Sequence, residues 1–327
     1  MNAPVMNLRA AFVVSICLSA AVGAAAAFDL QGHRGARGDA PENTLPAFER
    51  ALEIGVSTLE LDIGSTADGV VVLSHDSYLN PAIARGADGR WLAGPRGPLI
   101  RSLTMEQLLA YDVGRIDPDT PYARSFPAQR PRDGTRVPTL ASLFDRVKAL
   151  GANDVRFNIE TKIHPGRPED TAGPDAMVRA LLDVIRDAGM TQRVSIQSFD
   201  WRTLRLVQRL EPSIPTVCLT VQTANNDNLR DGEWTGGAKF TDHGSAPEMV
   251  KAAGCAVWSP NGGAVTELLV RQAQALGLKV IPWTINDAAD MERLIAWGVD
   301  GLITDYPARL RSVMRSRGLP LPRALGQ

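Results

Sequence analysis

Charged side chains alternate with uncharged ones in two short segments of the sequence. Glu60 and Asp62 are separated by a leucine, and Glu160 and Lys162 are separated by a threonine. Side chains two positions apart in a β-strand lie on the same face. If both strands belong to one sheet, three carboxylates and one ammonium group therefore face the same space.

Three buried carboxylates need positive charge around them, because a buried charge without a partner is very costly. A divalent cation held by Glu60, Asp62 and Glu160 would supply that charge. Ligation through oxygen alone favours Mg²⁺ or Ca²⁺ over zinc. The alternative is a layer of ion pairs, in which Lys162 and nearby arginines neutralise the carboxylates without a metal.

Two of the four histidines in the sequence lie at the ends of β-rich segments near these acidic residues. They are His33 and His75. A turn centred between Ala67 and Asp68 would place His75 opposite Glu60, on the same face of the sheet. Because imidazole has an unperturbed pKa of about 6.5, two histidines beside a metal site indicate general acid–base catalysis.

The elements that must position these side chains are short β-rich segments that alternate with amphipathic helical patterns. Eight such segments predict a parallel sheet closed into a TIM (β/α)8 barrel. The predicted strands are residues 28–33, 58–63, 155–160, 194–198, 216–220, 256–259, 280–284 and 301–304. Residues 70–75 follow the second strand too closely for a parallel crossover, so we expect an extra antiparallel hairpin strand there.

A long interruption rich in glycine, proline and arginine covers residues 77–137. A structureless loop of this length would be unusual in a compact domain. We therefore predict a small folded insertion over the barrel mouth, with one helix near residues 104–109. The barrel domain is expected to span residues 28–314, and a flexible tail is expected over residues 315–327.

The first 27 residues have the pattern of a secretory signal peptide. Arg9 is their one charged side chain, an apolar run over residues 10–22 follows, and small residues lead to Ala27. The apolar run is shorter than the roughly 20 residues that span a bilayer. We expect removal of residues 1–27, export to the periplasm, and no stable membrane anchor in the mature chain.

The composition excludes several classes of protein. With 44% hydrophobic and 22% charged residues, the chain is not a disordered one. The 35 basic and 36 acidic residues nearly cancel, so we expect no nucleic-acid partner. Beyond the predicted signal peptide, Cys218 and Cys255 lie in apolar segments, and we expect small buried side chains there rather than a disulfide.

Several motifs, taken in order, resemble the glycerophosphodiester phosphodiesterase family. They are Gly32-His33-Arg34-Gly35, Pro41-Glu42-Asn43-Thr44, Glu60-Leu61-Asp62, Thr66-Ala67-Asp68-Gly69, His75-Asp76, Ile159-Glu160-Thr161-Lys162, Ser198-Phe199, Trp283-Thr284-Ile285-Asn286 and Ile303-Thr304-Asp305-Tyr306-Pro307. The match covers roughly residues 28–310. Members of this family are TIM barrels with a segment inserted after the hairpin, so the resemblance implies the same fold here.

The resemblance also implies roles for the residues that the spacing brings together. His33 and His75 match the catalytic histidines of the family. Glu60, Asp62 and Glu160 match its metal ligands, which implies one divalent cation, Ca²⁺ or Mg²⁺.

Further residues match groups that contact the substrate. Arg34 and Lys162 match residues that hold the phosphate. Glu42 matches a polar residue near the site, and Trp283 matches a tryptophan at the barrel mouth. That indole could pack on glycerol, stack on a cationic head group, or belong to the core.

Five other residues are expected near the site or at the start of a helix. Asn43 and Thr44 are expected to cap the helix that begins at residue 45, since both residue types accept hydrogen bonds from the first helical turn. Gln197, Asn286 and Asp305 are candidates for the lining of the site.

The implied reaction is hydrolysis of glycerophosphodiesters, as small-molecule substrates, to glycerol 3-phosphate and an alcohol. The nucleophile is either water or the substrate's own glycerol hydroxyl, which would give a cyclic phosphate. The alternatives are a lysophospholipase D-like phosphodiesterase and a lyase that stops at the cyclic product. The chain could instead be a binding protein built on a barrel that has lost its enzymatic activity. Such a protein would be expected to have lost catalytic residues, and the motifs above retain them.

Overall fold

The computed structural model describes residues 1, 3 and 27–327. Most of the predicted signal peptide therefore lies outside the described residues. Within the described part of the chain, no helix is long and apolar enough to cross a membrane.

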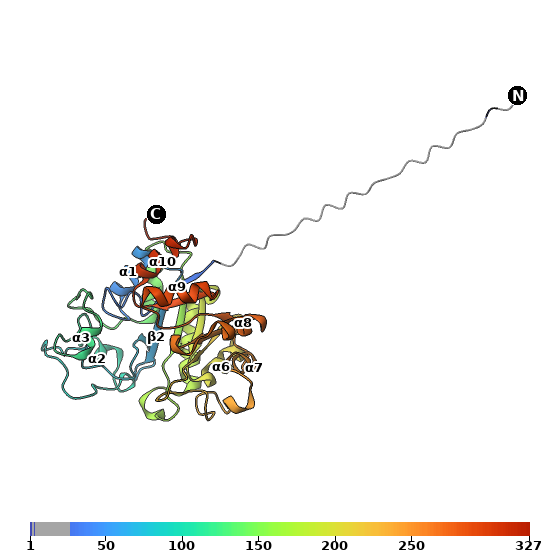
Figure 1. Cartoon of the computed structure of the whole chain (residues 1–327). Helices are drawn as coiled ribbons and strands as arrows, with labels where there is room; N and C mark the ends of the chain where they lie inside the picture. The colour runs from blue at the N-terminus through green and yellow to red at the C-terminus, as the bar shows by residue number, and fades with distance from the viewer. Residues whose placement is uncertain (2, 4–26) are drawn as a thin grey trace.

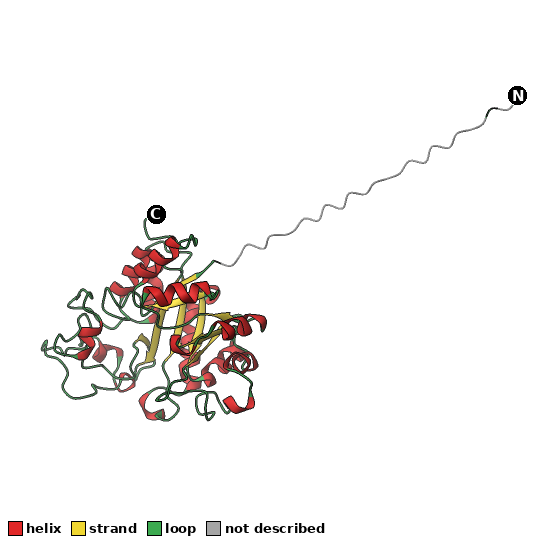
Figure 2. Ribbon diagram, viewed as in Figure 1, coloured by secondary structure: helices red, strands yellow, loops and turns green. Residues whose placement is uncertain are grey.

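The described chain forms a barrel of eight parallel strands, with a ninth strand paired to its side (Figure 2). The strands are β1 (Asp29–Gly32), β2 (Thr58–Ser65), β3 (Val71–Leu73), β4 (Arg156–Thr161), β5 (Val194–Ser198), β6 (Thr216–Thr220), β7 (Val257–Pro260), β8 (Lys279–Val280) and β9 (Gly301–Thr304). The order around the barrel is β8-β7-β6-β5-β4-β2-β1-β9. Hydrogen bonds from Asp300 N to Val280 O (2.9 Å) and from Ile303 N to Pro282 O (3.0 Å) join β9 to the β8 segment. The predicted TIM barrel is thus confirmed.

Amphipathic helices cover the outside of the barrel (Figure 1). The α-helices are α1 (Leu45–Ile54), α2 (Met105–Leu108), α3 (Pro121–Ser125), α4 (Leu140–Ala149), α5 (Pro174–Asp187), α6 (Trp201–Leu210), α7 (Ala246–Ala252), α8 (Glu267–Ala275), α9 (Ala288–Ala296) and α10 (Pro307–Ser316). In α5, the buried side chains recur at helical spacing, from Met177 through Leu181 to Ile185. Burying this stripe against the sheet stabilises the helix.

The alternation in β2 and β4 directs apolar side chains outward and polar ones inward. Leu59, Leu61 and Ile63 are fully buried in the core between the sheet and the helices. Phe157 of β4 belongs to the same core and contacts Phe144 of α4 edge to face, with 4.9 Å between ring centroids. The polar residues between them are left to face the barrel interior, as the sequence predicts.

The hairpin strand β3 pairs antiparallel with β2 as predicted, but in a register shifted by one residue. Ile63 lies opposite Leu73, and Ser65 lies opposite Val71. The turn centres on Asp68 because Gly69, with φ of 80°, adds one more residue to it. The prediction that His75 lies opposite Glu60 is therefore wrong.

The insertion after β3 folds around an apolar cluster of its own. The cluster consists of Val72, Leu79, Ala84, Ile100, Leu108, Val113 and Val137. Helix α2 begins at the predicted place, where Thr104 and Gln107 form a reciprocal capping box. The lobe that carries α2 and α3 lies to one side of the barrel (Figure 1).

The C-terminal segment packs on the barrel rather than fraying, in contrast to the expected flexible tail. Leu325 N donates to Leu52 O (2.9 Å), and Ala324 is buried. Arg311 Nη1 donates to the carbonyl oxygens of Pro322 (2.6 Å) and Gly55 (3.0 Å). Apolar contacts and the partly buried Arg311 guanidinium thus hold a segment whose prolines suggested disorder.

The two cysteines of the barrel form a disulfide, so the expectation of unpaired buried side chains is wrong. Cys218 and Cys255 are 5.9 Å apart at Cα. Cys218 lies within β6, and Cys255 precedes β7, whose Val257 pairs with Val217. Because β6 and β7 are adjacent, the two side chains meet in the core outside the barrel. Sequence spacing gave no register for these strands and so could not place the two residues together.

Candidate active site

The predicted acidic residues meet inside the barrel near the C-terminal ends of β2 and β4. Asp62 lies directly opposite Glu160 in the parallel register. Glu60, Asp62 and Glu160 are all buried, and one carboxylate oxygen from each lies within 4.8 Å of the others. TIM-barrel enzymes place their active sites at this end of the barrel.

The charge balance of this cluster fits a divalent cation. Burial raises the pKa of Glu60 well above its usual value, and the charges of Asp62 and Glu160 raise it further. Burial also raises the pKa of Glu160 to about 7, against the opposing effect of Lys162. Asp62 Oδ1 is buried and has no hydrogen-bond partner in the structure. An all-oxygen donor set with this surplus of negative charge suits Mg²⁺ or Ca²⁺.

The ion-pair layer considered as an alternative is present only in part. Lys162 Nζ lies 2.7 Å from Glu160 Oε1 and 3.8 Å from Asp62 Oδ1. Arg34 Nε lies 3.3 Å from Asp62 Oδ2. These cations face Asp62 and Glu160, and the third carboxylate, Glu60, accepts from the amide of Gln197 (2.7 Å) and the backbone N–H of Arg34 (2.8 Å).

His33 follows β1 and enters the same site. Its Nδ1 donates to Asp305 Oδ1 at 2.6 Å, and its Nε2 lies 3.9 Å from Glu60 Oε2. Asp305 also accepts from Arg37 Nε (2.8 Å) and from Asn286 Nδ2 (2.7 Å). A carboxylate on Nδ1 fixes the tautomer in which Nε2 carries the lone pair toward the acidic cluster.

The surroundings of His33 keep its imidazole neutral. Burial, followed by the charge of Arg37, lowers the pKa of His33 to about 4, against the opposing effect of Asp305. The pKa of Asp305 is lowered, because its hydrogen bond and charge contacts with His33 and Arg37 outweigh burial.

His75 lies beyond the end of β3, at the edge of the site. Its Nδ1 lies 3.0 Å from Asp76 Oδ1, and Asp76 accepts from Asn80 Nδ2 at 2.8 Å. Burial would raise the pKa of Asp62, and His75 exerts the largest of the opposing effects that lower it. The neighbouring Ser74 N donates to Asp62 O at 3.1 Å, and His75 lines a small hollow with Asn43, which holds Asp62. His75 therefore lies on the side of Asp62, rather than opposite Glu60 as the sequence predicted.

Arg34 is held by a tight loop between β1 and α1. Its backbone is left-handed, with φ of 50°, an uncommon conformation for a residue other than glycine. Gly35 follows with φ of 88°, and a Cβ there would lie 2.6 Å from the carbonyl carbon of Ala47. The guanidinium donates from Nη1 to Glu42 Oε1 at 2.6 Å. Glu42 thus belongs to the site, as predicted, through its ion pair with Arg34.

Thr44 caps α1, as predicted, but Asn43 has a different role. The Thr44 hydroxyl accepts from Ala47 N at 3.4 Å. Asn43 instead adopts φ of 52°, donates from Nδ2 to Asp62 Oδ2 (2.9 Å) and accepts from Asp62 N (3.2 Å). Its side chain therefore holds a predicted metal ligand, and the assignment of Asn43 as a cap is wrong.

Two residues of the site were not predicted. Arg37 binds Asp305 through both Nε and Nη2. Tyr122 on α3 of the insertion donates its hydroxyl to Glu42 Oε2. Arg37 lies three residues beyond Arg34 without a motif of its own, and Tyr122 lies in a segment of irregular composition, so the sequence carried no signal for either.

Trp283 follows β8, beside the end of β7, and its ring packs on an apolar cluster that includes Val257 and Ile281. Its Nε1 donates to Ser259 O at 3.0 Å, and its ring meets that of Phe199 edge to face at 5.3 Å. Phe199 lies beside Trp234 at 6.5 Å and below Lys162 Nζ at 5.9 Å. The partly buried rings of Phe199, Trp234 and Trp283 thus form an aromatic cluster. The cluster lies next to Lys162, which is predicted to bind phosphate.

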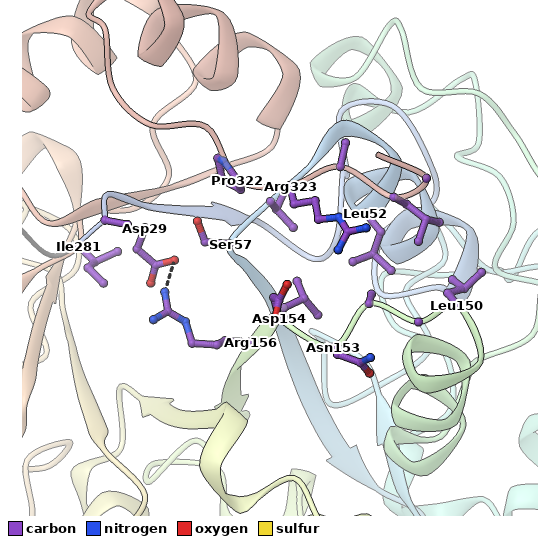
Figure 3. Close-up of a pocket in the computed structure, with 18 of the residues that line it drawn as sticks. Asp29, Leu52, Ser57, Leu150, Asn153, Asp154, Arg156, Ile281, Pro322 and Arg323 are labelled. Carbon is purple, nitrogen blue, oxygen red and sulfur yellow. Dashed lines mark ion pairs between the residues drawn. The ribbon is translucent and has the colours of Figure 1, made fainter. Parts of the chain in front are cut away.

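A large cavity in the described structure lies at the other end of the barrel (Figure 3). It has a volume of about 500 Å³ and is lined at the starts of strands, by Asp29 of β1 and Arg156 of β4 among others. These two side chains form an ion pair at 3.1 Å. The cavity contains none of the predicted catalytic residues, and the N-terminal face of a TIM barrel usually serves stability.

The fold and the site define a TIM-barrel enzyme with a buried acidic centre and two histidines at its C-terminal face. Residues 33–309 match the family model described as the glycerophosphoryl diester phosphodiesterase family. A glycerophosphodiester phosphodiesterase of Bacillus subtilis is 30% identical over 289 residues, which cover 86% of this chain and 85% of that protein. The chain therefore belongs to the glycerophosphoryl diester phosphodiesterase family and is an enzyme of that type.

Solved structures agree with this assignment. A crystal structure from Silicibacter pomeroyi with the same family name is 36% identical, with a TM-score of 0.82, and covers 91% of this chain and 96% of that one. A phosphodiesterase from Oleispira antarctica, solved with the product sn-glycerol-3-phosphate, shares the fold at 22% identity and a TM-score of 0.64. That alignment covers 88% of this chain and 96% of that one.

Proposed function

We propose that the protein hydrolyses glycerophosphodiesters to glycerol 3-phosphate and an alcohol, using His33 and His75 as an acid–base pair beside a divalent cation. The observation that carries this proposal is the position of both histidines beside the cluster of Glu60, Asp62 and Glu160: His33 Nε2 lies 3.9 Å from Glu60, and His75 follows Ser74, whose N–H donates to Asp62 O. Family membership and the product bound in the Oleispira antarctica relative support the substrate class.

Arg34 and Lys162 would bind the nonbridging oxygens of the phosphodiester. Their charged groups flank Asp62, at 3.3 and 3.8 Å respectively. Arginine offers two donors in one plane, which suits a phosphate. Both groups stay positive in the site, because the acidic residues raise their pKa values against the effect of burial.

The two imidazoles would exchange protons with the attacking and leaving oxygens. Each has an aspartate at Nδ1, Asp305 for His33 and Asp76 for His75, which leaves Nε2 available to the substrate. One histidine takes the proton of the nucleophile, and the other donates a proton to the leaving alcohol.

Glu60, Asp62 and Glu160 would hold Mg²⁺ or Ca²⁺. When bound, the cation would supply positive charge that stabilises the charge developing on the phosphoryl oxygens. Asn43 and Gln197 hold two of these carboxylates in place through amide hydrogen bonds, a support that metal ligands commonly need.

The test is phosphorus NMR of the products formed from glycerophosphocholine and from a lysophospholipid, with Mg²⁺ or Ca²⁺ present. We expect glycerol 3-phosphate from the soluble diester. Turnover of the lysophospholipid alone would favour the lysophospholipase D-like alternative, and accumulation of a cyclic phosphate would favour a lyase. Absence of turnover on both substrates with either metal would refute the proposed function.

We also propose that the protein is exported to the periplasm. The pattern of residues 1–27 supports export, and the disulfide between Cys218 and Cys255 suits an oxidising compartment. Mass spectrometry of the enzyme from a periplasmic fraction should find a mature N-terminus near Phe28. A cytoplasmic chain with an intact leader would contradict the proposal.

A further inference from the structure

Helix α3 of the insertion contacts the loop that carries His33 and Arg34. Tyr122 donates its hydroxyl to Glu42 Oε2 and accepts from Arg37 Nη1 at 3.3 Å. Four residues on, the ring of Phe126 lies under the Arg37 guanidinium at 4.6 Å and meets the Tyr122 ring edge to face. Gln129 then donates to Arg37 O at 2.8 Å.

The Tyr122 hydroxyl lies where two chains of contacts meet. One runs through Glu42 to Arg34, whose Nη1 donates to Glu42 Oε1 at 2.6 Å. The other runs through Arg37 to Asp305, the carboxylate that binds His33. Glu42 is almost fully buried and Tyr122 partly so. A hydrogen bond to a buried carboxylate is stronger than one in water, and its loss leaves the carboxylate short of a donor.

We propose that Tyr122 is a positioning residue for phosphate recognition: it fixes Glu42, and Glu42 fixes the guanidinium of Arg34. This inference rests on the proposed function in that it takes Arg34 as a phosphate-binding group. The geometry thus connects helix α3 of the insertion to Arg34 through the Tyr122 hydroxyl and Glu42.

The substitution Tyr122→Phe removes the hydroxyl but keeps the ring that packs on Phe126. In Tyr122→Phe, Glu42 Oε2 loses its donor from α3, and the carboxylate can turn away from Arg34. We expect the Kd for inorganic phosphate, measured by calorimetry on the full chain, to rise about five-fold. We expect KM for glycerophosphocholine to rise by a similar factor, with kcat changed less than about two-fold.

The matched control is Tyr111→Phe, which removes a hydroxyl from the same insertion at a residue that packs on the insertion's own apolar cluster. We expect wild-type affinity and turnover from this variant. A double-mutant cycle with Glu42→Gln shows whether Tyr122 acts through Glu42. If it does, Tyr122→Phe has little further effect on phosphate affinity in the Glu42→Gln background.

Three results would overturn the inference. These are unchanged phosphate affinity in Tyr122→Phe, additive effects in the cycle, and an equal loss of affinity in Tyr111→Phe, which would mark a general disturbance of the insertion. The binding assay with phosphate does not require turnover. A failure of the proposed function can therefore be told apart from a failure of this inference. A wild-type chain that binds phosphate but cleaves no diester would refute the reaction and leave the role of Tyr122 testable by the same titration.

Discussion

At the scale of single residues, the site consists of two imidazoles that differ in their surroundings. His33 is enclosed by the β1–α1 loop and bound by Asp305, which Arg37 and Asn286 hold in turn. His75 is one-third exposed at the edge of the site. This difference suits a reaction with two proton transfers. One imidazole would act within the enclosed site, and the other would act where the product alcohol leaves toward solvent.

Replacement of either histidine should abolish most of the turnover. We expect His33→Ala and His75→Ala each to reduce kcat by a factor of about 10² or more, because each removes one acid–base group. Circular dichroism should show a folded barrel in both variants. His243→Ala, in the loop before α7, serves as the control and should keep wild-type activity. Near-normal turnover in either folded site variant would exclude that histidine from the reaction.

Asp305→Asn tests the orientation of His33 without a change of side-chain shape. An amide at this position can donate to Nδ1, which favours the tautomer whose lone pair points away from the acidic cluster. We expect kcat to fall about tenfold or more with little change in KM. Nitrogen NMR of the His33 ring should report the altered tautomer. Asp287→Asn at the start of α9 is the control, since asparagine caps a helix as well as aspartate does. An unchanged ring signal in Asp305→Asn would contradict this account.

At the scale of elements, adjacent strands β6 and β7 are joined by a disulfide on the helix-facing side of the barrel. The bridge closes a loop between residues 37 positions apart. A cross-link of this kind limits the unfolded chain and typically contributes about 2–4 kcal/mol to stability. The strands it joins carry no predicted metal ligand, so its role is in stability rather than catalysis.

Reduction of this bridge should lower the melting temperature and leave kcat nearly unchanged. The paired variant Cys218→Ala/Cys255→Ala should show the same decrease in free energy of unfolding, about 2–4 kcal/mol. Urea unfolding of the oxidised, reduced and variant proteins measures it. Equal midpoints for all three would show that the bridge does not form or does not stabilise the barrel.

The features that could be predicted from the sequence are those determined by residues close together along the chain. Alternation placed Leu59 and Leu61 against the helices and Glu60 and Asp62 in the barrel, because every second side chain of a strand shares a face. It failed for His75, where one glycine in the turn shifted the register. It also missed contacts between distant segments, such as Tyr122 with Glu42, since neither residue's local pattern encodes the position of the other.

At the scale of the whole molecule, three carboxylates from two strands are brought together at a cost in charge repulsion. Burial and mutual repulsion raise the pKa values of Glu60 and Glu160. A group that binds the folded state and neutralises this charge stabilises the fold by mass action. Binding of a cation at Glu60, Asp62 and Glu160 would therefore raise the free energy of unfolding of the barrel.

Chelation should remove activity and lower the melting temperature together. Return of Mg²⁺ or Ca²⁺ at about 100 times its Kd should restore turnover and add about 2.7 kcal/mol to the free energy of unfolding. Differential scanning calorimetry measures the shift. Asp62→Asn is the matched variant and should respond to the added cation much less than the wild type. Full activity after exhaustive chelation would remove the metal from the reaction.

Residue 27, where the continuously described part of the chain begins, lies close to the C-terminal segment, at the rim of the barrel opposite the catalytic residues. Ala27 and Gly326 both line the cavity at the starts of the strands. An affinity tag or a surface tether attached at the C-terminus, or at residue 28 of the proposed mature chain, would therefore sit behind the enzyme. An immobilised preparation of the mature chain would present its catalytic opening to the solution from either attachment.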